Sequence, residues 1–154
     1  YYEGFNDSNI KKFTSHKNYH YTKDMALEYF NTLKNNKKII HFVLEDIIIG
    51  KIVASFSLQS IDSKFYSAEL ARTIGNAKYL NIGLGTSMTK FLINYAFNKT
   101  SIEFIWVGNN YKNISAIISN KKNGFIEMNK SQINKYIKKI DNNSIYMFIK
   151  KNEK

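Results

Sequence analysis

Hydrophobic and polar positions follow two different spacings in the first part of this chain. After Thr22, a suitable N-cap, apolar residues recur at helical spacing and predict an amphipathic helix that ends at 35–38; they are Ala26, Tyr29, Phe30 and Leu33. Apolar segments 39–44 and 47–58, the second alternating with polar residues toward its end, then predict two strands. We place the turn between them at Glu45 and Asp46.

The second part of the chain changes repeatedly between the two spacings. It predicts a strand at 65–74, a loop at 75–80, a helix from Gly83, a strand at 102–107 and a helix at 113–122. Late strands at 125–128 and 145–149 flank a polar, Lys-rich insertion. Strands followed by strand–helix–strand–helix predict an α/β (α+β) domain, a mixed sheet with helices on both faces. With no proline, repeat or linker-like stretch, we expect one domain over 1–154.

Composition limits the classes of protein that fit. The chain lacks cysteine, which excludes disulfides and thiolate metal sites, and none of its apolar runs approaches the roughly 20 residues of a membrane span. Its three histidines, His16, His20 and His41, share no metal-ligand spacing, so we expect no metal. These features favour a cytoplasmic protein without a membrane partner.

The formal charge of +11 comes almost entirely from lysine, since Arg72 is the only arginine. Such a charge raises nucleic acid as a partner, and a basic nucleic-acid-binding module is one alternative function. Lysine, asparagine and isoleucine are abundant together, a bias that AT-rich coding also produces. We therefore favour a basic surface that serves a small anionic ligand.

A glycine-containing loop supplies the main candidate for such a ligand. Gly83 and Gly85 let backbone amides approach an anion closely, and the helix that begins there directs its positive end at it. The dinucleotide fingerprint fails because Met88 stands at its third glycine, and the Walker pattern fails because no Lys-Ser/Thr pair follows Gly85. By itself the loop also fits a glycine turn that only starts a helix.

The order of motifs resembles the GNAT superfamily of acetyl-CoA-dependent N-acetyltransferases. That pattern is Arg/Gln-x-x-Gly-x-Gly/Ala after a strand, then Asn-x-x-Ala/Ser, then Gly-Phe. Here the matching positions are Gly83 and Gly85, then 113–116, then 124–125. The resemblance covers about 69–125 and implies acetyl-CoA at the strand–loop–helix junction. More loosely, Phe5-Asn6-Asp7 resembles the first helix of the ribosomal-protein N-terminal acetyltransferase branch, which would put the family's first strand before Tyr1.

The resemblance implies a set of cofactor contacts. Backbone groups would hold the pantetheine arm and the pyrophosphate, and side chains on the second helix would add to them. The implied residues are Thr73, Ile74, Gly75, Asn81, Ile82, Gly83, Leu84, Gly85, Thr86, Asn113, Ser115 and Lys121. Leu80 departs from the pattern, because the family has Arg or Gln there, so one side-chain contact to the pyrophosphate is lost.

Glu69 and Asn120 are the candidate catalytic positions. Glu69 begins the strand before the loop, and a partly buried glutamate with a raised pKa suits removal of a proton from an ammonium; its alternative is a surface carboxylate. Asn120 stands where the family often has the tyrosine that protonates the departing thiolate. Strict alternation puts Glu69 and Arg72 on opposite faces of their strand.

The predicted activity is direct transfer of an acetyl group to a primary amine. Aromatic and basic residues in the acceptor regions favour an anionic acceptor such as a nucleotide-linked amino sugar, whereas the branch resemblance favours a protein N-terminal amine; they are Phe5, Tyr19, His20, Tyr21, Lys130, Lys135, Tyr136, Lys138 and Lys139. A non-catalytic CoA-binding or regulatory domain remains the other alternative. A homodimer is compatible with this family.

Overall fold

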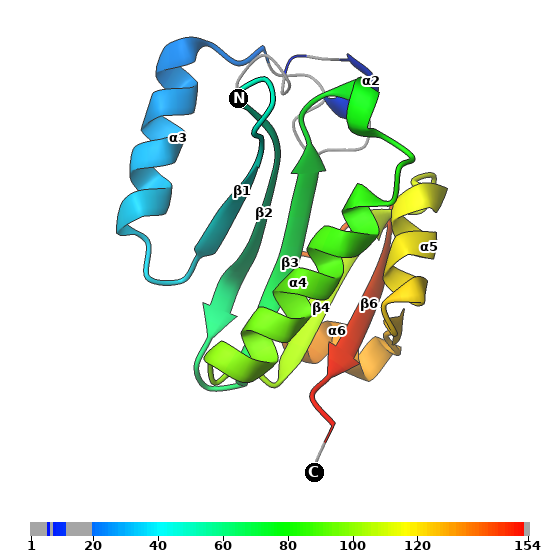
Figure 1. Ribbon diagram of the computed structural model, residues 1–154. Helices are drawn as coiled ribbons and strands as arrows, with labels where there is room; N and C mark the ends of the chain where they lie inside the picture. The colour runs from blue at the N-terminus through cyan, green and yellow to red at the C-terminus, as the bar shows by residue number, and fades with distance from the viewer. Residues whose placement is uncertain (1–5, 7, 12–19, 153–154) are drawn as a thin grey trace.

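The computed structural model describes Asn6, 8–11 and 20–152 as a six-stranded sheet with helices on both faces (Figure 1). Its strands are β1 (Ile40–Asp46), β2 (Lys51–Asp62), β3 (Ser67–Ile74), β4 (Phe104–Asn110), β5 (Ile126–Glu127) and β6 (Ser144–Lys150). Its helices are α2 (Ser8–Lys11), α3 (Lys23–Asn35), the 3₁₀ turn η1 (Ala77–Tyr79), α4 (Leu84–Lys99), α5 (Ile114–Lys122) and α6 (Lys130–Tyr136). In the described part of the chain, helices that combine the length and the apolar character of a membrane span are absent.

The strand order is β1-β2-β3-β4-β6-β5, and every neighbouring pair is antiparallel except β3 and β4. A parallel pair needs a crossover connection, which α4 provides. The predicted mixed, mostly antiparallel α/β sheet is therefore confirmed. Phe5 and Asp7, on which the resemblance to a first helix rested, lie outside the described residues.

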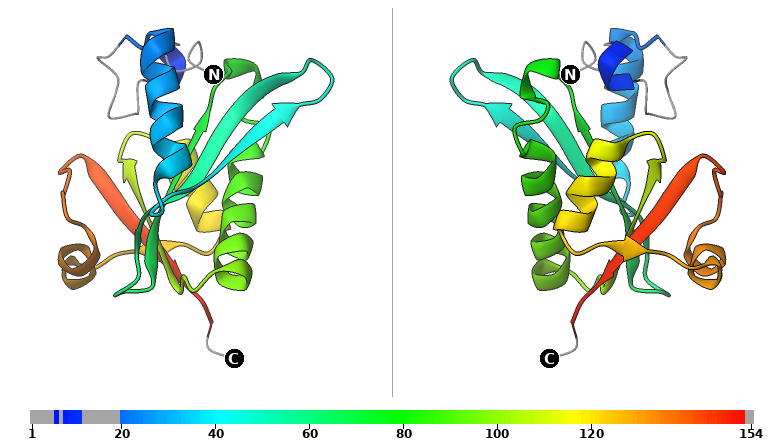
Figure 2. Two further views of the ribbon diagram at one scale, coloured as in Figure 1. Left: turned by 90° about the vertical axis from the view of Figure 1, so that its left-hand side faces the viewer. Right: turned by 90° about the vertical axis from the view of Figure 1, so that its right-hand side faces the viewer.

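Each face of the sheet has its own core (Figure 2). Under α4 and α5 the core contains fully buried aliphatic side chains, and the largest of them are Leu58, Leu70, Leu92, Ile105 and Met147. On the opposite face α6 covers an aromatic cluster, where the ring of Tyr136 stacks on Phe104 at 4.0 Å between centroids. Alternation along each strand sends successive side chains to these two cores.

Local signals explain where the sequence predictions hold. The Thr22 hydroxyl accepts a hydrogen bond from the Met25 amide and begins α3, as predicted. Asn113 caps α5 in the same way, through a bond from the Ala116 amide. These caps are local contacts between residues three positions apart, so the sequence shows them directly.

One prediction of local structure is wrong, and one helix was not predicted. The turn between β1 and β2 lies at 47–50 rather than at Glu45 and Asp46, because Gly50 adopts a φ of +60° that favours glycine. Ile47 and Ile48 therefore stand at the exposed tip of the hairpin instead of beginning a strand. The Lys-rich insertion contains α6, which a reciprocal capping box between Asn129 and Gln132 begins.

Candidate active site at the split between two strands

The two central strands separate part of the way along their length. Ser67, Ala68 and Glu69 of β3 pair with 104–106 of β4, and the described pairing stops there. Residues 70–74 of β3 and 107–110 of β4 continue without facing each other in a ladder, and Figure 1 shows the upper end of β3 standing apart from β4. We call this opening the sheet split. It leaves main-chain groups on both strands available to a ligand.

The glycine loop and the start of α4 lie on one side of the split. Gly83 is the N-cap of α4 with a φ of +86°, and no side chain caps the helix there. Asn81 also adopts a positive φ of 63°. Because the amides of the first turn have no intrahelical partner, this helix start can accept an anion. The positive φ values of Asn81 and Gly83 let the chain turn sharply into the start of α4.

A hydrogen bond fastens the segment before this loop to the first hairpin. The hydroxyl of Tyr79, in η1, donates to Asp46 at 2.5 Å. This bond lowers the pKa of Asp46 and raises that of Tyr79. Asn76 caps η1 through a bond from the Lys78 amide. The loop thus has a defined position relative to β1 and β2.

Hydrogen bonding to β2 decides which amides of β3 face the split. The Gly75 amide donates to the Val53 carbonyl at 2.7 Å. Since amides alternate between the two edges of an antiparallel strand, Thr73 also points its amide toward β2, whereas Arg72 and Ile74 point theirs toward the split. Of the predicted triplet 73–75, Ile74 is therefore the residue whose amide is placed to meet a ligand in the split.

Glu69 faces the side of the split opposite to α4. It accepts a hydrogen bond from the Ser60 hydroxyl at 3.3 Å and a second one from the side chain of Gln59, its cross-strand neighbour. Burial is the largest influence on this carboxyl and raises its pKa, and the two hydrogen bonds only partly oppose the shift. Glu69 thus has the partial burial and the raised pKa that suit the removal of a proton from an ammonium.

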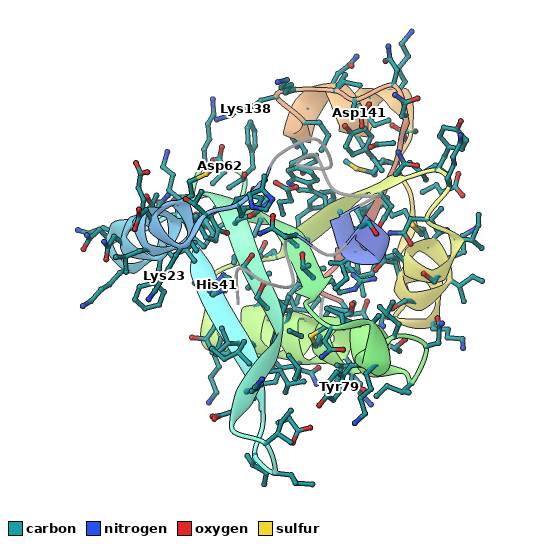
Figure 3. The ribbon with its side chains drawn as sticks, turned by 90° about the horizontal axis from the view of Figure 1, so that it is seen from above. Lys23, His41, Asp62, Tyr79, Lys138 and Asp141 are labelled. Atoms are coloured by element: carbon teal, nitrogen blue, oxygen red, sulfur yellow. The ribbon has the colours of Figure 1, made fainter. Side chains whose placement is uncertain are left out.

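A cavity of about 1170 Å³ opens beside Glu69. Aromatic side chains form part of its wall, and they are Phe65, Trp106, Tyr136 and Tyr146. Six lysines line it against three acids; the lysines are Lys37, Lys38, Lys64, Lys135, Lys138 and Lys139, and the acids are Asp62, Glu69 and Asp141. Figure 3 shows Asp62, Lys138 and Asp141 together on the side of the molecule opposite Tyr79. The cavity is therefore aromatic and basic.

Hydrogen bonds engage all three acids in this wall. Asp62 accepts from the amides of Lys64 and Phe65, and Asp141 accepts from the Asn143 amide and the Ser144 hydroxyl. Glu69 also accepts two hydrogen bonds, but burial raises its pKa, and it lies in this wall next to its register partner Trp106.

Arg72 faces the helices, as alternation predicted. Its Nη2 donates to the Ala116 carbonyl of α5 at 3.4 Å, and its Nε lies 3.5 Å from where a Cβ on Gly85 would stand. Burial lowers its pKa to about 10, so it stays charged at neutral pH. Among the described residues the recorded ion pair joins Lys121 to Glu127, so Arg72 carries its buried charge without an acidic partner.

A buried amide pair lies on the same face. The Asn120 side chain of α5 donates to the Asn109 side chain of β4 at 3.2 Å. Asn120 Oδ1 and Asn109 Nδ2 remain buried without a hydrogen-bond partner. Asn120 is 0 % exposed, and an amide holds no proton that it gives up near neutral pH. The sequence analysis missed Asn109, because an asparagine near the end of a strand resembles an ordinary turn residue.

The remaining predicted residues are only partly brought together. Asn113 lies at the start of α5, where its side chain also accepts from the Ser115 hydroxyl. Thr86 contacts α5 through the Ser119 hydroxyl at 3.2 Å, which joins the two helices. Lys121 lies in the last turn of α5 and pairs with Glu127 of β5 at 3.4 Å, toward the far edge of the sheet from β3. The structure does not bring it to the split.

The predicted acceptor residues divide in a similar way. Lys135, Tyr136, Lys138 and Lys139 line the cavity, whereas Lys130, His20 and Tyr21 are not in its wall. Phe5 and Tyr19 lie outside the described residues. The turn between α3 and β1 adds Lys37 and Lys38, and the loop before β3 adds Lys64; no local motif marks these lysines. A separate, more open hollow of about 860 Å³ lies along α3, away from the split.

His41 lies in β1 with its Nδ1 buried and without a hydrogen-bond partner among the described residues. Burial lowers its pKa, so the imidazole is neutral at pH 7. Groups of three or more side chains suited to hold a metal are absent from the described residues.

Comparison with known proteins places the fold. No family model and no curated protein matches the sequence. Among solved structures, spermidine N-acetyltransferase from Vibrio cholerae, in complex with CoA and spermine, matches with a TM-score of 0.78 and 19% identity over 97% of this chain and 86% of that one. A chimera of that enzyme and hSSAT gives a TM-score of 0.71 and 17% identity over the same shares. The V. cholerae enzyme in complex with manganese ions gives a TM-score of 0.66 and 18% identity over 84% of this chain and 75% of that one.

At identities this low, the structural similarity shows a shared fold and does not show a shared substrate. The chain shares the fold of these solved N-acetyltransferases, in agreement with the mixed sheet that the sequence predicted.

Proposed function

We propose that this protein is an N-acetyltransferase that moves the acetyl group of acetyl-CoA directly to a primary amine. The observation that carries the proposal is the position of the sheet split. On one side of it lie the start of α4, which has no side-chain cap, and the partly buried Arg72, and on the other lies a cavity whose wall includes Glu69. A long anionic donor and an amine can thus approach each other from opposite faces of one sheet.

The residues present fit the donor. Its pyrophosphate would lie at the amides of 81–86, where Gly83 supplies the backbone turn. Its pantetheine arm carries amides that need donors and acceptors, and the split offers the outward-facing amide of Ile74 and the unpaired atoms of Asn109 and Asn120. Acetyl-CoA supplies a thioester, whose thiolate leaves readily because thiols have a pKa of about 8.5.

Glu69 would act as the general base. An amine arrives as an ammonium and must lose a proton before its nitrogen can attack a carbonyl carbon. Burial raises the pKa of Glu69, which makes its carboxylate a better proton acceptor than an exposed glutamate. The carboxylate takes the proton directly or through one water. Water then protonates the leaving thiolate, since Asn120 cannot do so.

The walls of the cavity support an acceptor that carries an anionic group next to its amine. Six lysines against three acids make the cavity attractive to phosphate or carboxylate. The aromatic wall suits stacking on a flat or ring-shaped group, and Lys135 already lies over the rings of Phe65 and Tyr136. A nucleotide-linked amino sugar has both features, and we propose that class of acceptor.

Two other acceptors are tested beside it. Spermidine is the acceptor named for the similar solved enzyme, but a polycation would enter this basic cavity against electrostatic repulsion. A protein N-terminal amine requires an open approach for the chain that follows it. The cavity of about 1170 Å³ has room for the first residues of such a chain, so this acceptor is the second proposal.

Thiol release from acetyl-CoA, measured with a panel of amines, tests the function. The panel should hold nucleotide-linked amino sugars, short peptides with free N-termini and spermidine. We expect turnover that is fastest with the anionic amines and that falls about a hundredfold or more in Glu69→Gln, with acetyl-CoA affinity retained. Fastest turnover with spermidine would overturn the acceptor class and leave the acetyltransferase activity standing.

Calorimetry separates this activity from the alternatives. Tight acetyl-CoA binding without turnover of any amine would favour a non-catalytic CoA-binding domain, for which the departures at Leu80 and Asn120 argue. Absence of acetyl-CoA binding, together with salt-dependent binding of RNA or DNA, would favour the nucleic-acid module instead.

A further inference from the structure

Arg72 is a charged residue to which the glycine loop and the start of α4 assign no role. It is the only arginine of the chain and lies partly buried under α4 and α5. The recorded hydrogen bond of its guanidinium is one contact of 3.4 Å to the Ala116 carbonyl. A buried charge normally has an ionic partner or several hydrogen bonds, because taking it out of water is costly. Arg72 has neither among the described residues.

The surroundings of Arg72 point to where its missing partner lies. Its Nε approaches Gly85, the second residue of α4, so the guanidinium lies directly beneath the first turn of that helix. The amides of this turn are the anion-binding groups of the loop. Gly85 carries no side chain that would separate the guanidinium from them. A cation and a helix start thus converge on one place.

A second, independent observation marks the same level of the split as a place for a polar ligand. The last recorded pair of β3 and β4 joins Glu69 to Trp106. Arg72 and Asn109 each lie three positions further along, so they are at the same register level on opposite sides of the sheet split. Asn109 is 8 % exposed and Asn120 0 %, yet each keeps one unpaired polar atom. Buried polar atoms without partners are rare and call for a ligand or an ordered water.

We propose that Arg72 binds the pyrophosphate of acetyl-CoA from beneath α4 and takes the place of the arginine or glutamine that Leu80 replaces in the loop. This inference rests on the proposed function and assigns a residue that the loop motif does not contain. The contact comes from β3 instead of from the loop, so the sequence pattern cannot reveal it. Binding would give the guanidinium the acidic partner that it lacks in the free protein.

A role in ligand binding also agrees with the small contribution that Arg72 makes to the stability of the fold. Its single long contact contributes little to the fold, and burial of its charge opposes folding. A residue kept for the fold would be destabilising to remove, whereas a residue kept for a ligand need not be. The free energy of unfolding of ligand-free Arg72→Gln should therefore stay close to that of the unchanged protein.

The test compares donors with and without the pyrophosphate. In Arg72→Gln we expect CoA to bind about tenfold or more weakly by calorimetry, because a charged hydrogen bond to phosphate is lost. In kinetics the KM for acetyl-CoA should rise while kcat holds. Acetyl-pantetheine keeps the thioester and the arm but lacks the pyrophosphate, so its kcat/KM should change by less than about twofold. Lys90→Gln, on the exposed side of α4, is the matched control and should bind CoA normally.

Each result separates this proposal from the proposed function. If the unchanged protein binds no CoA, the proposed function fails. If it binds CoA and Arg72→Gln binds it equally well, the assignment of Arg72 alone is overturned. Equal losses with acetyl-CoA and acetyl-pantetheine would also overturn it, because Arg72 would then act at the thioester end. If Arg72→Gln does not fold, Arg72→Lys provides the measurement, since it keeps a charge at the site but not the forked geometry; it should bind CoA more weakly than arginine does.

Discussion

Glu69 and Arg72 lie three residues apart on β3 and face opposite sides of the sheet. The carboxyl of Glu69 opens on the cavity, and the guanidinium of Arg72 lies under α4 and α5. The two charges therefore do not pair. An ion pair with Arg72 would have lowered the pKa of Glu69. Each side of the strand keeps one ionisable group for a separate task, the carboxyl for the amine and the guanidinium for the donor.

Replacement of Glu69 by glutamine tests the role of its carboxyl through pH. A general base works only when deprotonated, and burial raises the pKa of Glu69 above its ordinary value of 4.5. The kcat/KM of the unchanged protein should therefore fall as the pH decreases through this raised pKa. In Glu69→Gln the rate should be low and this acidic limb should disappear. A limb that persists in the variant would assign the titration to another group.

The same carboxyl has a consequence for stability. A group whose pKa is raised by folding holds its proton more tightly in the folded state. Its favourable contribution is present below its unfolded pKa and is lost as the pH rises through the folded pKa. Glu69→Gln, which cannot ionise, should therefore melt at the same or a higher temperature than the unchanged protein at pH 7. A clearly lower melting temperature would show that the hydrogen bonds from Gln59 and Ser60 outweigh burial.

Gly83 and Gly85 should respond differently to alanine. Gly83 has a φ of +86°, so Gly83→Ala should lower the free energy of unfolding by about 1–2 kcal/mol. A Cβ on Gly85 meets its nearest neighbour at an ordinary 3.5 Å, so Gly85→Ala should fold normally. Its new methyl group would stand between Arg72 and the first turn of α4 and weaken CoA binding. Urea unfolding and calorimetry measure the two effects, and the reverse pattern would contradict the assignment.

Asn109 and Asn120 should behave as a coupled pair. Asn120→Leu leaves the Asn109 amide buried without its partner and should cost about 1–3 kcal/mol of unfolding free energy. Asn109→Val with Asn120→Leu removes both amides and should cost less than the sum of the two single changes. Denaturant unfolding of the four proteins gives the coupling energy. Additive losses would mean that the recorded hydrogen bond contributes nothing.

The basic cavity should control the choice of acceptor. Lys135→Glu combined with Lys138→Glu reverses the balance of charge in its wall. The KM for an anionic amine should rise about tenfold, and the use of spermidine should improve, because the sign of the local potential changes. Lys23→Glu combined with Lys34→Glu on α3, outside the cavity, makes the same change of net charge and is the control. Equal effects in the control would mean that the net charge of the protein, and not the charge of the cavity wall, controls the choice of acceptor.

Much of this site follows local rules that a sequence displays. The caps at Thr22 and Asn113, the glycine at 83 and the alternation along β3 depend on neighbours three or four positions away at most. The turn at 47–50 was misplaced because three successive isoleucines resemble a strand, although only Gly50 has the backbone freedom that the turn needs. The helix α6 was missed because its apolar residues contact the opposite face of the sheet.

The sequence by itself determined the order of the strands and of the helices α3, α4 and α5, the glycine loop at the start of α4 and the facing of Glu69 and Arg72, because these depend on residues close together in the chain. Only the tertiary structure decided where β3 and β4 separate, that Asn109 meets Asn120, and that lysines from three distant segments line one cavity. It also placed Lys121 next to Glu127 of β5, away from the sheet split. These relationships arise when the sheet closes over residues far apart in sequence, and hydrophobic spacing carries no record of which distant segments will meet.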